Sequence, residues 1–326
     1  MRKKNTATKS KASNKATSTG KRLFVAFAAL ALFAILGLNY KGTSGPNVSS
    51  NDELASRSVK IVRNDGRSGG TGSILRSYAS ESEILTNSHV CEVIENGGMV
   101  ITEKSTHRVT SYYQSNAHDL CIVKVAANLG MDTPVAQKAP ESYTQATVSG
   151  HPRLLPNVVT KGHFSGRESI EILTKIRPCT ADDMNGADVV LCAAIGGIPV
   201  ITRYEAQLVT ALIQPGSSGS AVFNDEGEIS AVVFAGAGGL SYAFTVPYEQ
   251  VANFVFRESV LADFKKPNDT YEINMDYILG GGQRSFDQTS TEFKLDKACS
   301  DMSLVMQNKT IAKACQLRGT NLIWTR

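Results

Sequence analysis

The chain is 326 residues long, and its 42% of hydrophobic and 20% of charged residues are typical of a protein that buries a core, which excludes wholesale disorder. The formal net charge is +4, but the first 22 residues contain eight basic and no acidic residues, which leaves 26 basic against 30 acidic residues in the rest. This mildly acidic remainder gives no electrostatic case for binding nucleic acid.

The first 40 residues predict a tail followed by a membrane segment. Residues 1–22 are basic and rich in Ser, Thr and Asn, so they cannot bury enough surface to fold, and we expect a solvated cytoplasmic tail. Residues 23–38 contain no polar side chain, and the bases before them fit the positive-inside rule. We therefore expect a single transmembrane signal anchor at residues 23–40, with everything after it on the periplasmic or extracellular side.

Three other interpretations of residues 23–38 stay open. They could be a buried helix of a soluble protein, the apolar core of a cleaved signal peptide, or part of a mitochondrial presequence. An A-x-A arrangement is missing after residue 38, and Thr43-Ser44-Gly45 is the best substitute, which favours an anchor over a cleaved signal. A presequence is amphipathic, whereas this segment is apolar all round.

Short apolar runs separated by turn residues follow a linker at residues 41–55. The linker begins with a stretch that is mostly Gly, Ser, Asn and Pro, as is typical of connecting segments. The runs after it predict strands at residues 59–62, 72–75, 83–86, 99–102, 120–125, 146–148, 189–192 and 229–234. Residues 224–227 are typical of a hairpin turn. Many short strands with little helical periodicity predict an all-β domain at residues 56–260, as an antiparallel sandwich or barrel.

Helical spacing is clear in one place. Pro247 stands at a first-turn position, and apolar residues follow it with helical spacing at Val251, Phe254 and Val255. This pattern predicts a helix at residues 247–259 that packs one face on the β domain. Residues 261–326 form a separate C-terminal appendix whose role the sequence does not predict, and the spacing of residues 293–315 also permits a helix there.

All six cysteines lie beyond the predicted anchor, at Cys91, Cys121, Cys179, Cys192, Cys299 and Cys315. An even number in an exported chain predicts disulfide bonds, although six cysteines allow fifteen arrangements. Cys179 with Cys192 and Cys299 with Cys315 are local pairs that could close small loops. A straight helix would hold the last two about 24 Å apart, so a disulfide between them requires a bend or a helical hairpin.

Ser218 lies in a loop of small residues, PGSSGS at 215–220, directly before a predicted strand. Small neighbours let the backbone turn tightly and direct a hydroxyl and successive N–H groups at one point. His89 directly follows one apolar strand, and Asp119 begins another. Because a serine nucleophile needs an imidazole to take its proton and a carboxylate to orient that imidazole, the three residues predict acyl-transfer chemistry.

Five sequence blocks resemble, in the same order, those of chymotrypsin-fold serine proteases. The blocks are GTGSIL (70–75), LTNSHV (85–90), DLCIVKV (119–125), PGSSGS (215–220) and SYAFTVP (241–247). The Deg-type (high-temperature-requirement) bacterial branch is the most similar, because residues 150–152 and 160–166 also resemble segments that it carries. The resemblance covers about residues 56–258, and it implies two antiparallel β-barrels with the active site between them.

The resemblance also implies roles for individual residues. His89 would be the general base and then the general acid, Asp119 would orient it, and Ser218 would be the nucleophile. The N–H groups of Gly216 and Ser218 would form the oxyanion hole. The strand around residues 233–235 would pair with the substrate backbone. Together with the predicted anchor, the resemblance implies a membrane-anchored serine endopeptidase that acts on protein or peptide substrates, with no cofactor and no metal. The oligomeric state is not predicted.

The resemblance extends to specificity. Family members that cut after Lys or Arg carry an Asp six residues before the nucleophile, where this chain has Leu212 followed by Ile213. Neither side chain can pair with a buried cation, whose desolvation costs several kcal/mol. The alignable substrate-binding residues on the opposite wall belong to the run Val233, Phe234 and Ala235. We therefore expect cleavage after small or medium aliphatic residues.

Two positions depart from the family pattern. Ser217 stands where the family usually has Asp or Asn, so an ion pair with a newly cut N-terminus cannot form. Ser220 replaces a glycine and must find space in a crowded turn. The Deg branch also usually carries PDZ domains after the protease; residues 261–326 are too few for one and lack a strand pattern, so we expect none.

A zinc site is one alternative. His89-x-Cys91 and His118-x-x-Cys121 supply two histidines and two cysteines, which is a common zinc ligand set. These spacings lie in predicted strands, however, and zinc would not explain the glycine-rich serine loop. Cys91 and Cys121 could instead pair with each other or stay reduced.

The motif residues also admit interpretations without catalysis. His89, Asp119 and Ser218 could be a core histidine, a strand-end cap and a turn residue. The chain could also be a catalytically impaired protease-like binding module on the membrane exterior. Ser217 and Ser220 argue for such a module, and the intact His, Asp and Ser argue against it.

Overall fold

The computed structural model describes residues 50–185, 188–236, 241–275, 295, 299–300, 309–319 and 323–324. They belong to one compact unit, Val48–Arg326. The predicted tail, the predicted anchor and most of the predicted linker lie outside the described residues. Within the described ranges, no helix is long and apolar enough to cross a membrane.

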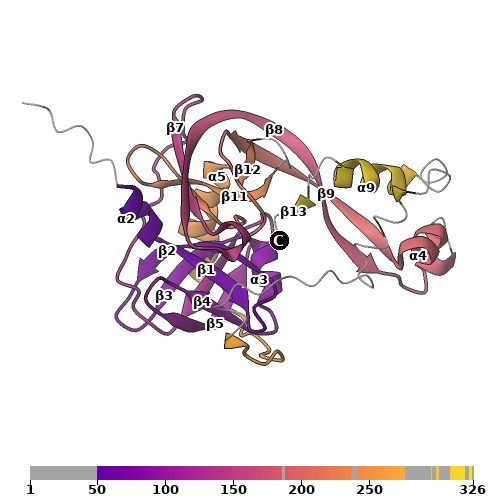
Figure 1. The fold of residues 1–326 in the computed structure, drawn as a ribbon, viewed down its shortest axis with the longest axis horizontal. Coiled ribbons are helices and arrows are strands. Elements are labelled where there is room, and N and C mark those ends of the chain that lie inside the picture. Colours follow the sequence, from indigo (N-terminus) through magenta and orange to yellow (C-terminus); the bar gives the residue numbers. More distant parts are fainter. Residues whose placement is uncertain are drawn as a thin grey trace, which may run out of the picture. The chain divides into compact units, whose positions relative to one another are not determined.

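Six antiparallel strands close into a barrel in the first half of this unit (Figure 1). They are β1 (Ser58–Arg63), β2 (Gly69–Ser77), β3 (Ser82–Thr86), β4 (Gly98–Ile101), β5 (Thr106–Gln114) and β6 (Cys121–Val125). Hydrogen bonds join them in the order β1–β2–β3–β6–β5–β4, and β4 pairs back with β1. Fully buried side chains such as Ile61, Ile84 and Val123 fill the barrel, so apolar burial is its main source of stability.

A second sheet follows. Its main strands are β7 (Gln145–Gly150), β8 (Val158–Pro178), β9 (Gly197–Val209), β10 (Ala221–Phe223), β11 (Ile229–Gly236) and β12 (Ala243–Val246). They pair in the order β7–β8–β9–β12–β11–β10, and β10 pairs back with β7. A two-residue strand, β13 (Ile323–Trp324), adds to β11 and β8. The fold is therefore mostly β, with a closed six-stranded barrel and a second sheet, which is consistent with the expected double barrel.

Most of the predicted strands are confirmed. Seven of the eight predicted runs lie on β1, β2, β3, β4, β6, β7 and β11. The predicted hairpin turn joins β10 to β11, and the Gly227 N–H donates to the Asn224 carbonyl at 3.1 Å. Gly227 has a φ of 74°, a conformation that favours glycine.

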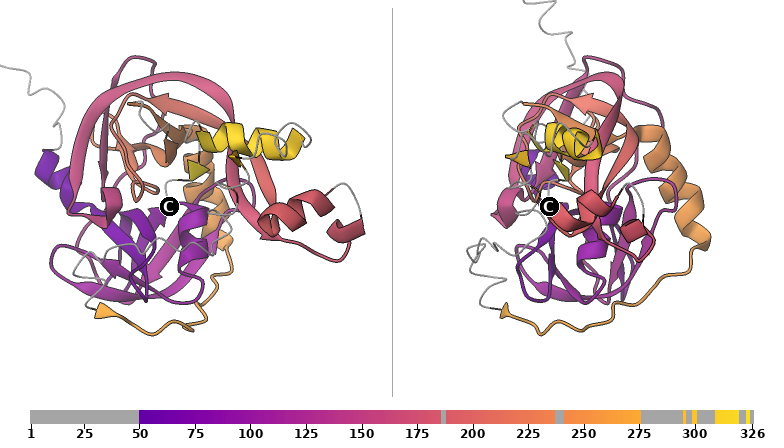
Figure 2. Two further views of the ribbon diagram at one scale, coloured as in Figure 1. Left: turned by 45° about the vertical axis from the view of Figure 1, so that its right-hand side comes forward. Right: turned by 90° about the vertical axis from the view of Figure 1, so that its right-hand side faces the viewer.

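The strands β8 and β9 form a long ribbon that extends away from the second sheet (Figures 1 and 2). Their pairing runs from Phe164 opposite Val209 to Pro178 opposite Gly197. At the far end, the helix α4 (Val189–Ile195) packs on the ribbon together with α9 (Lys309–Gly319). This ribbon and the two helices share their own apolar cluster, which includes Leu173, Leu191, Ile195, Ile198, Ile311, Ala314 and Leu317.

The predicted strand at residues 189–192 was wrong, because these residues begin α4. Their β-branched and apolar composition is typical of a strand, but tertiary contacts decide the outcome. Leu191, Cys192 and Ile195 are the buried residues of the helix, and Cys192 forms a disulfide with Cys179 on the ribbon side. Gly196 ends the helix with a φ of 71°, which is the common left-handed helix cap.

The remaining helices are short. The helix α2 (Asn51–Ser56) overlaps the end of the predicted linker, and α3 (Ser88–Val93) follows β3. The predicted helix at residues 247–259 is confirmed as α5 (Tyr248–Asn253), which continues as a π-helical turn (Phe254–Glu258) and a 3₁₀ turn (Ser259–Leu261). Two further 3₁₀ turns lie at Pro152–Leu154 and Asp183–Asn185.

One straight helix over residues 293–315 is not found. Ser300 forms a turn, and α9 begins at Lys309. The disulfide between Cys299 and Cys315 has a Cα–Cα distance of 5.4 Å, much shorter than the about 24 Å that a straight helix would give.

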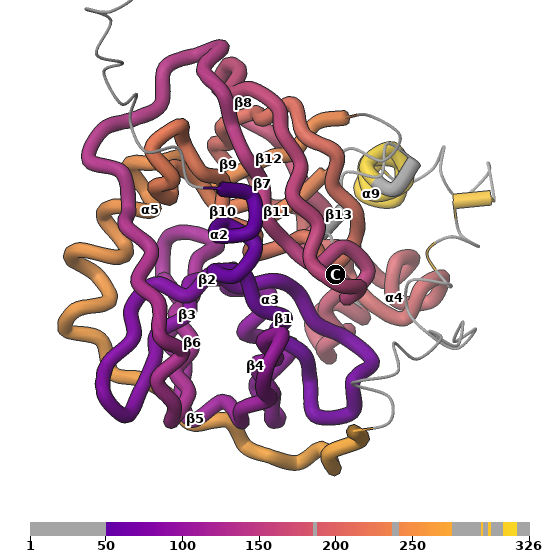
Figure 3. Tube along the Cα trace, turned by 60° about the vertical axis from the view of Figure 1, so that its left-hand side comes forward, coloured from indigo at the N-terminus to yellow at the C-terminus, as the bar shows by residue number. Residues whose placement is uncertain are grey.

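Residues 263–275 run along the outside of the first barrel (Figure 3). Lys265 and Tyr112 exchange backbone hydrogen bonds at 2.8 and 2.9 Å, and the Asn274 N–H donates to the Asn64 carbonyl at 2.9 Å. The Arg63 guanidinium lies 4.6 Å from the centre of the Tyr271 ring. The first part of the predicted appendix therefore stays attached to the first barrel.

Candidate active site

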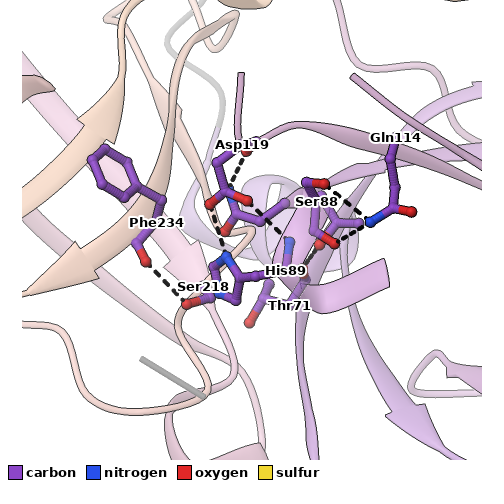
Figure 4. A network of polar contacts seen from close by, with 9 residues as sticks. Thr71, Ser88, His89, Gln114, Asp119, Ser218 and Phe234 are labelled. Atoms are coloured by element: carbon purple, nitrogen blue, oxygen red, sulfur yellow. Dashed lines mark hydrogen bonds and ion pairs between the residues drawn. The ribbon is translucent and has the colours of Figure 1, made fainter. Parts of the chain in front are cut away.

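His89 and Asp119 form a buried pair in the first barrel (Figure 4). His89 lies in the first turn of α3, directly after β3, and Asp119 precedes β6, which pairs with β3. The His89 Nδ1–H donates to Asp119 Oδ2 at 2.7 Å, and the His89 backbone N–H donates to Asp119 Oδ1 at 3.0 Å. The two side chains are only 3% and 2% exposed. Both carboxylate oxygens therefore hold the histidine in one orientation.

Neighbouring groups fix the position of Asp119. The Asn87 Nδ2 donates to the Asp119 carbonyl at 2.9 Å. Glu258, after α5, accepts hydrogen bonds from the loop that leads to Asp119, namely from the Ser115 hydroxyl at 2.9 Å and the Asn116 N–H at 3.0 Å. The turn that follows α5 therefore restrains the carboxylate loop from outside the barrel.

A disulfide also joins the two segments. Cys91, two residues after His89, bonds to Cys121, two residues after Asp119, with a Cα–Cα distance of 6.5 Å. Both cysteines are fully buried. Because their sulfurs are bonded to each other, neither is a thiolate ligand, so the zinc interpretation is wrong. Within the described residues, no group of three or more His, Cys, Asp or Glu side chains could hold a metal ion.

The second sheet supplies the serine loop, which docks on the first barrel through Thr71. The Thr71 N–H donates to the Ser218 carbonyl at 2.7 Å, and the Thr71 hydroxyl donates to the Gly216 carbonyl at 2.8 Å. The Thr86 hydroxyl supports this contact by donating to the Thr71 carbonyl at 2.7 Å. Two β2 and β3 hydroxyls thus fix the loop against the strands that lead to His89.

Glycine is required twice in this loop. Gly216 has a φ of 94° and Gly219 a φ of 85°, where other residues are strained. A Cβ on Gly216 would lie 2.8 Å from both the His151 carbonyl oxygen and the Arg153 nitrogen, and a Cβ on Gly219 would collide with the Thr71 carbonyl. The backbone at Ser218 is therefore held in a tight, specific turn.

The structure brings Ser218 close to the His89 side of the site. Figure 4 shows the Ser218 side chain at the edge of the His89 ring that lies away from Asp119. A Cβ on Gly70 would lie 2.9 Å from the Ser218 carbonyl and 2.7 Å from Val90, the residue after His89. The Ser218 hydroxyl also donates to the Phe234 carbonyl at 3.3 Å. The three residues of the predicted constellation therefore lie together, although they come from two sheets.

Gly216 and Ser218, the two residues expected to supply the N–H groups of an oxyanion hole, both lie in this turn. Among the described residues, no hydrogen-bond acceptor for the Gly216 N–H is found. The Arg153 N–H donates to the Pro215 carbonyl at 2.5 Å. This contact and the positive φ of Gly216 together orient the peptide bond between Pro215 and Gly216. Such an N–H is available to a developing oxyanion.

The two departures from the family pattern are accommodated. The Ser217 hydroxyl accepts a hydrogen bond from the Gln214 N–H at 3.2 Å, and the Ser217 N–H donates to the Gln214 carbonyl at 2.9 Å. These two hydrogen bonds hold Ser217 in a local turn, whereas an Asp at this position would be held by an ion pair with a newly cut N-terminus. Ser220 is fully buried, and its side chain fills the space that Gly150 leaves by lacking a Cβ.

A cleft of about 410 Å³ opens beside the histidine and the aspartate. One wall comes from α3 and from residues 115–119 between β5 and β6, and the other from the β8–β9 ribbon, including Lys175, Arg203 and Tyr204. Burial raises the pKa of Tyr204 to about 12, and the negative charge of Asp119 adds to the shift. The ribbon therefore covers the carboxylate side of the site.

The predicted specificity residues do not share one surface. Leu212 is 62% exposed, whereas Val233, Phe234 and Ala235 are buried in β11. The Phe234 ring packs 5.3 Å from the Tyr204 ring, so it is the Phe234 carbonyl that faces Ser218 (Figure 4). Ile213 lies against Gly236, with its Cδ1 2.6 Å from where a Cβ on that glycine would be.

Sequence reasoning missed three residues of the site. Thr71 and Asn87 lie within the quoted blocks GTGSIL and LTNSHV, so the blocks contained them without showing their contacts. Tyr204 had no sequence signal, because only the tertiary fold brings this ribbon residue to the cleft that Asp119 lines.

Several solved structures are similar to part of this chain. The Rv3671c protease from M. tuberculosis, in its active form, is 18% identical, with a TM-score of 0.49 over 68% of this chain and 88% of that chain. Its inactive form is 20% identical, with a TM-score of 0.47 over 67% and 96%. The serine endoprotease from Yersinia pestis is 18% identical, with a TM-score of 0.45 over 64% and 66%.

No curated protein gives a significant match to the sequence. The family model of the trypsin-like peptidase domain matches residues 70–232, which is half of the chain and contains His89, Asp119 and Ser218. The chain therefore belongs to the trypsin-like peptidase domain family.

Proposed function

We propose that the protein is a serine endopeptidase in which Ser218, His89 and Asp119 act as a catalytic triad. The observation that carries the proposal is the buried pair of His89 Nδ1 and Asp119 Oδ2, 2.7 Å apart, with Ser218 at the ring edge away from Asp119 (Figure 4). The carboxylate keeps the Nδ1 proton in place, so the Nε2 atom can accept a proton.

In the proposed reaction, His89 takes the Ser218 proton as the hydroxyl oxygen attacks the carbonyl carbon of the scissile peptide bond. The tetrahedral oxyanion is stabilised by the N–H groups of Gly216 and Ser218. The C–N bond then breaks, His89 gives its proton to the leaving amine, and an acyl-enzyme ester remains on Ser218. Water, activated by His89, hydrolyses the ester and regenerates the hydroxyl.

A fluorophosphonate probe and peptide hydrolysis test the proposal. The chain from residue 41 onward should react covalently with the probe and hydrolyse casein, and Ser218→Ala should do neither while its thermal unfolding stays nearly unchanged. Chelators should have no effect on either reaction. A chain that folds but neither reacts nor hydrolyses would instead be the catalytically impaired binding module.

We also propose that residues 23–40 anchor the protein in a membrane, with the protease domain on the extracytoplasmic side. The apolar run after eight bases supports this topology, as do the three disulfides, which persist in oxidising compartments. Protease added outside intact cells should digest the chain after residue 40 and spare the first 22 residues. A soluble mature form that begins near Gly45 would show a cleaved signal instead.

A further inference from the structure

The strand β13 lies on the edge of β11 that adjoins the candidate nucleophile. Trp324 is opposite Ala235 and Ile323 is opposite Gly236, in antiparallel register. On its other side, β13 pairs in parallel with β8, where Ile323 is opposite Leu173. Figures 1 and 2 show β13 between the ribbon and β11. Ile323 therefore has a partner strand on both sides, and Trp324 is paired with β11.

The direction of β13 is important. Because the pairing is antiparallel, the chain runs from the position opposite Gly236 to the position opposite Ala235, and the next residue of β11 in that direction is Phe234. The Phe234 carbonyl accepts a hydrogen bond from the Ser218 hydroxyl at 3.3 Å. An extended peptide in this register thus leads toward the nucleophile, along the segment of β11 where the substrate backbone is expected.

The contacts of α9 hold this strand in place. Ile311, Ala314 and Leu317 are buried against the ribbon cluster, of which Leu173 is a member. The Lys313 ammonium lies 2.6 Å from a carboxylate oxygen of Glu171 on β8. Since Ile323 follows the end of α9 by only four residues, docking of α9 keeps the strand at an effective concentration on the order of millimolar at β11.

We propose that the edge of β11 at Ala235 and Gly236 is an acceptor site for an extended peptide strand, and that this chain's own Ile323–Trp324 segment fills it. The proposal rests on the proposed function, because it makes the C-terminal appendix an intramolecular competitor of the substrate. Main-chain pairing gives a strand its affinity in such a site. Substrate therefore competes with β13 for this edge, which lowers the activity of the full chain without abolishing it.

Proline substitution tests the proposal in the full extracytoplasmic chain. Because Ile323 has β11 on one side and β8 on the other, its N–H points to one of these two strands. Ile323→Pro removes this hydrogen-bond donor and therefore disfavours the pairing of β13. We expect kcat/KM for a peptide substrate to rise at least about tenfold, as expected for release of a competitor at this effective concentration. Thr320→Pro is the control, because it adds the same ring before the paired residues. It should leave kcat/KM within about twofold of the value for the unmodified chain. Equal rates in the two variants would overturn the proposal.

A second measurement does not depend on catalysis. In the Ser218→Ala background, a fluorescent peptide with the sequence of residues 319–326, GTNLIWTR, should bind the Ile323→Pro chain at least about tenfold more tightly than the chain with an intact β13. Equal binding would overturn the acceptor site. Ile323→Gly with Trp324→Gly replaces the proline variant if the latter does not fold. If probe labelling fails while this difference in binding is found, the proposed function fails and the strand site stands.

Discussion

Gly150 and Ser220 occupy one space between β7 and the serine loop. A Cβ built on Gly150 would collide with the Ser220 hydroxyl and would lie 3.0 Å from the Ser220 Cβ and 3.3 Å from the Thr71 hydroxyl. The larger residue in the nucleophile turn is therefore accommodated by the smallest residue on the neighbouring strand. This relationship explains how the turn accepts Ser220 where the family usually has glycine.

Gly150→Ala should destabilise the protein by about 1 to 3 kcal/mol, because the added methyl overpacks a closed space. Urea unfolding measures the change. The double variant Gly150→Ala with Ser220→Gly should recover most of the loss, since the two side chains then exchange places. Gly166→Ala is the matched control, because a Cβ there would meet nothing within 4 Å. Additive effects of the two substitutions would show that the residues do not share this space.

Asp119→Asn should lower kcat by about 10³- to 10⁴-fold, because an amide cannot hold the His89 Nδ1 proton as the carboxylate does. KM should change little, since the substitution acts mainly on the transition state. Steady-state hydrolysis of a peptide substrate measures both values. Asp225→Asn, in the exposed turn between β10 and β11, is the control and should change neither. A loss of less than tenfold would argue against an orienting role for Asp119.

Removal of the Cys91–Cys121 disulfide should both destabilise the protein and slow its reaction with a fluorophosphonate. The loop that this bond closes has a sequence separation of 30 residues, for which chain entropy predicts a loss of about 3 to 4 kcal/mol. The Cys91→Ala, Cys121→Ala variant frees the segments that carry His89 and Asp119, so the labelling rate should fall at least about tenfold.

The disulfide at the ribbon tip provides the matched control. Cys179→Ala with Cys192→Ala opens a loop with a separation of 13 residues, far along the ribbon from Asp119. Labelling should stay within about twofold of the unmodified protein. A similar loss of labelling in both double variants would indicate a general loss of folding.

The sequence predicted which three residues lie together at the candidate site better than it predicted their surroundings. His89, Asp119 and Ser218 each lie in a short block next to a strand, so local sequence carries both the residue and the element that positions it. The disulfide between Cys91 and Cys121 could not be chosen from fifteen arrangements, because pairing depends on which strands are neighbours. Once β3 and β6 pair, the two cysteines meet.

The β8–β9 ribbon and the segments that pack on it could not be predicted from the sequence, for a physical reason. Val189 and Val190 favour a strand locally, but burial of Leu191 and Ile195 against the ribbon makes this segment a helix. Tyr204 lines the same cleft as Asp119, and the Trp324 backbone pairs with Ala235, across large separations in sequence. Contacts of this kind leave no periodic pattern in either partner.

The last prediction concerns His151, which supports the nucleophile turn. Its backbone N–H donates to the Thr71 hydroxyl at 2.9 Å, and its Nδ1–H donates to the Leu155 carbonyl at 3.1 Å. Burial lowers the pKa of His151 from 6.5 to about 4, and the nearby charge of Lys60 contributes to the shift. The folded state therefore keeps this imidazole neutral, whereas the unfolded state binds a proton below about pH 6.5.

Because the folded pKa lies below the unfolded one, the stabilisation from neutral His151 is present above pH 6.5 and is lost as the pH falls toward 4. Between pH 7 and pH 4.5, the free energy of unfolding should fall by about 2 to 3 kcal/mol through this group. His151→Gln cannot titrate, so its urea unfolding should depend less on pH over this range. The partly exposed His107 on β5 provides the control, since His107→Gln should keep the original pH dependence. Parallel curves for the protein and for His151→Gln would show that another group causes the acid sensitivity.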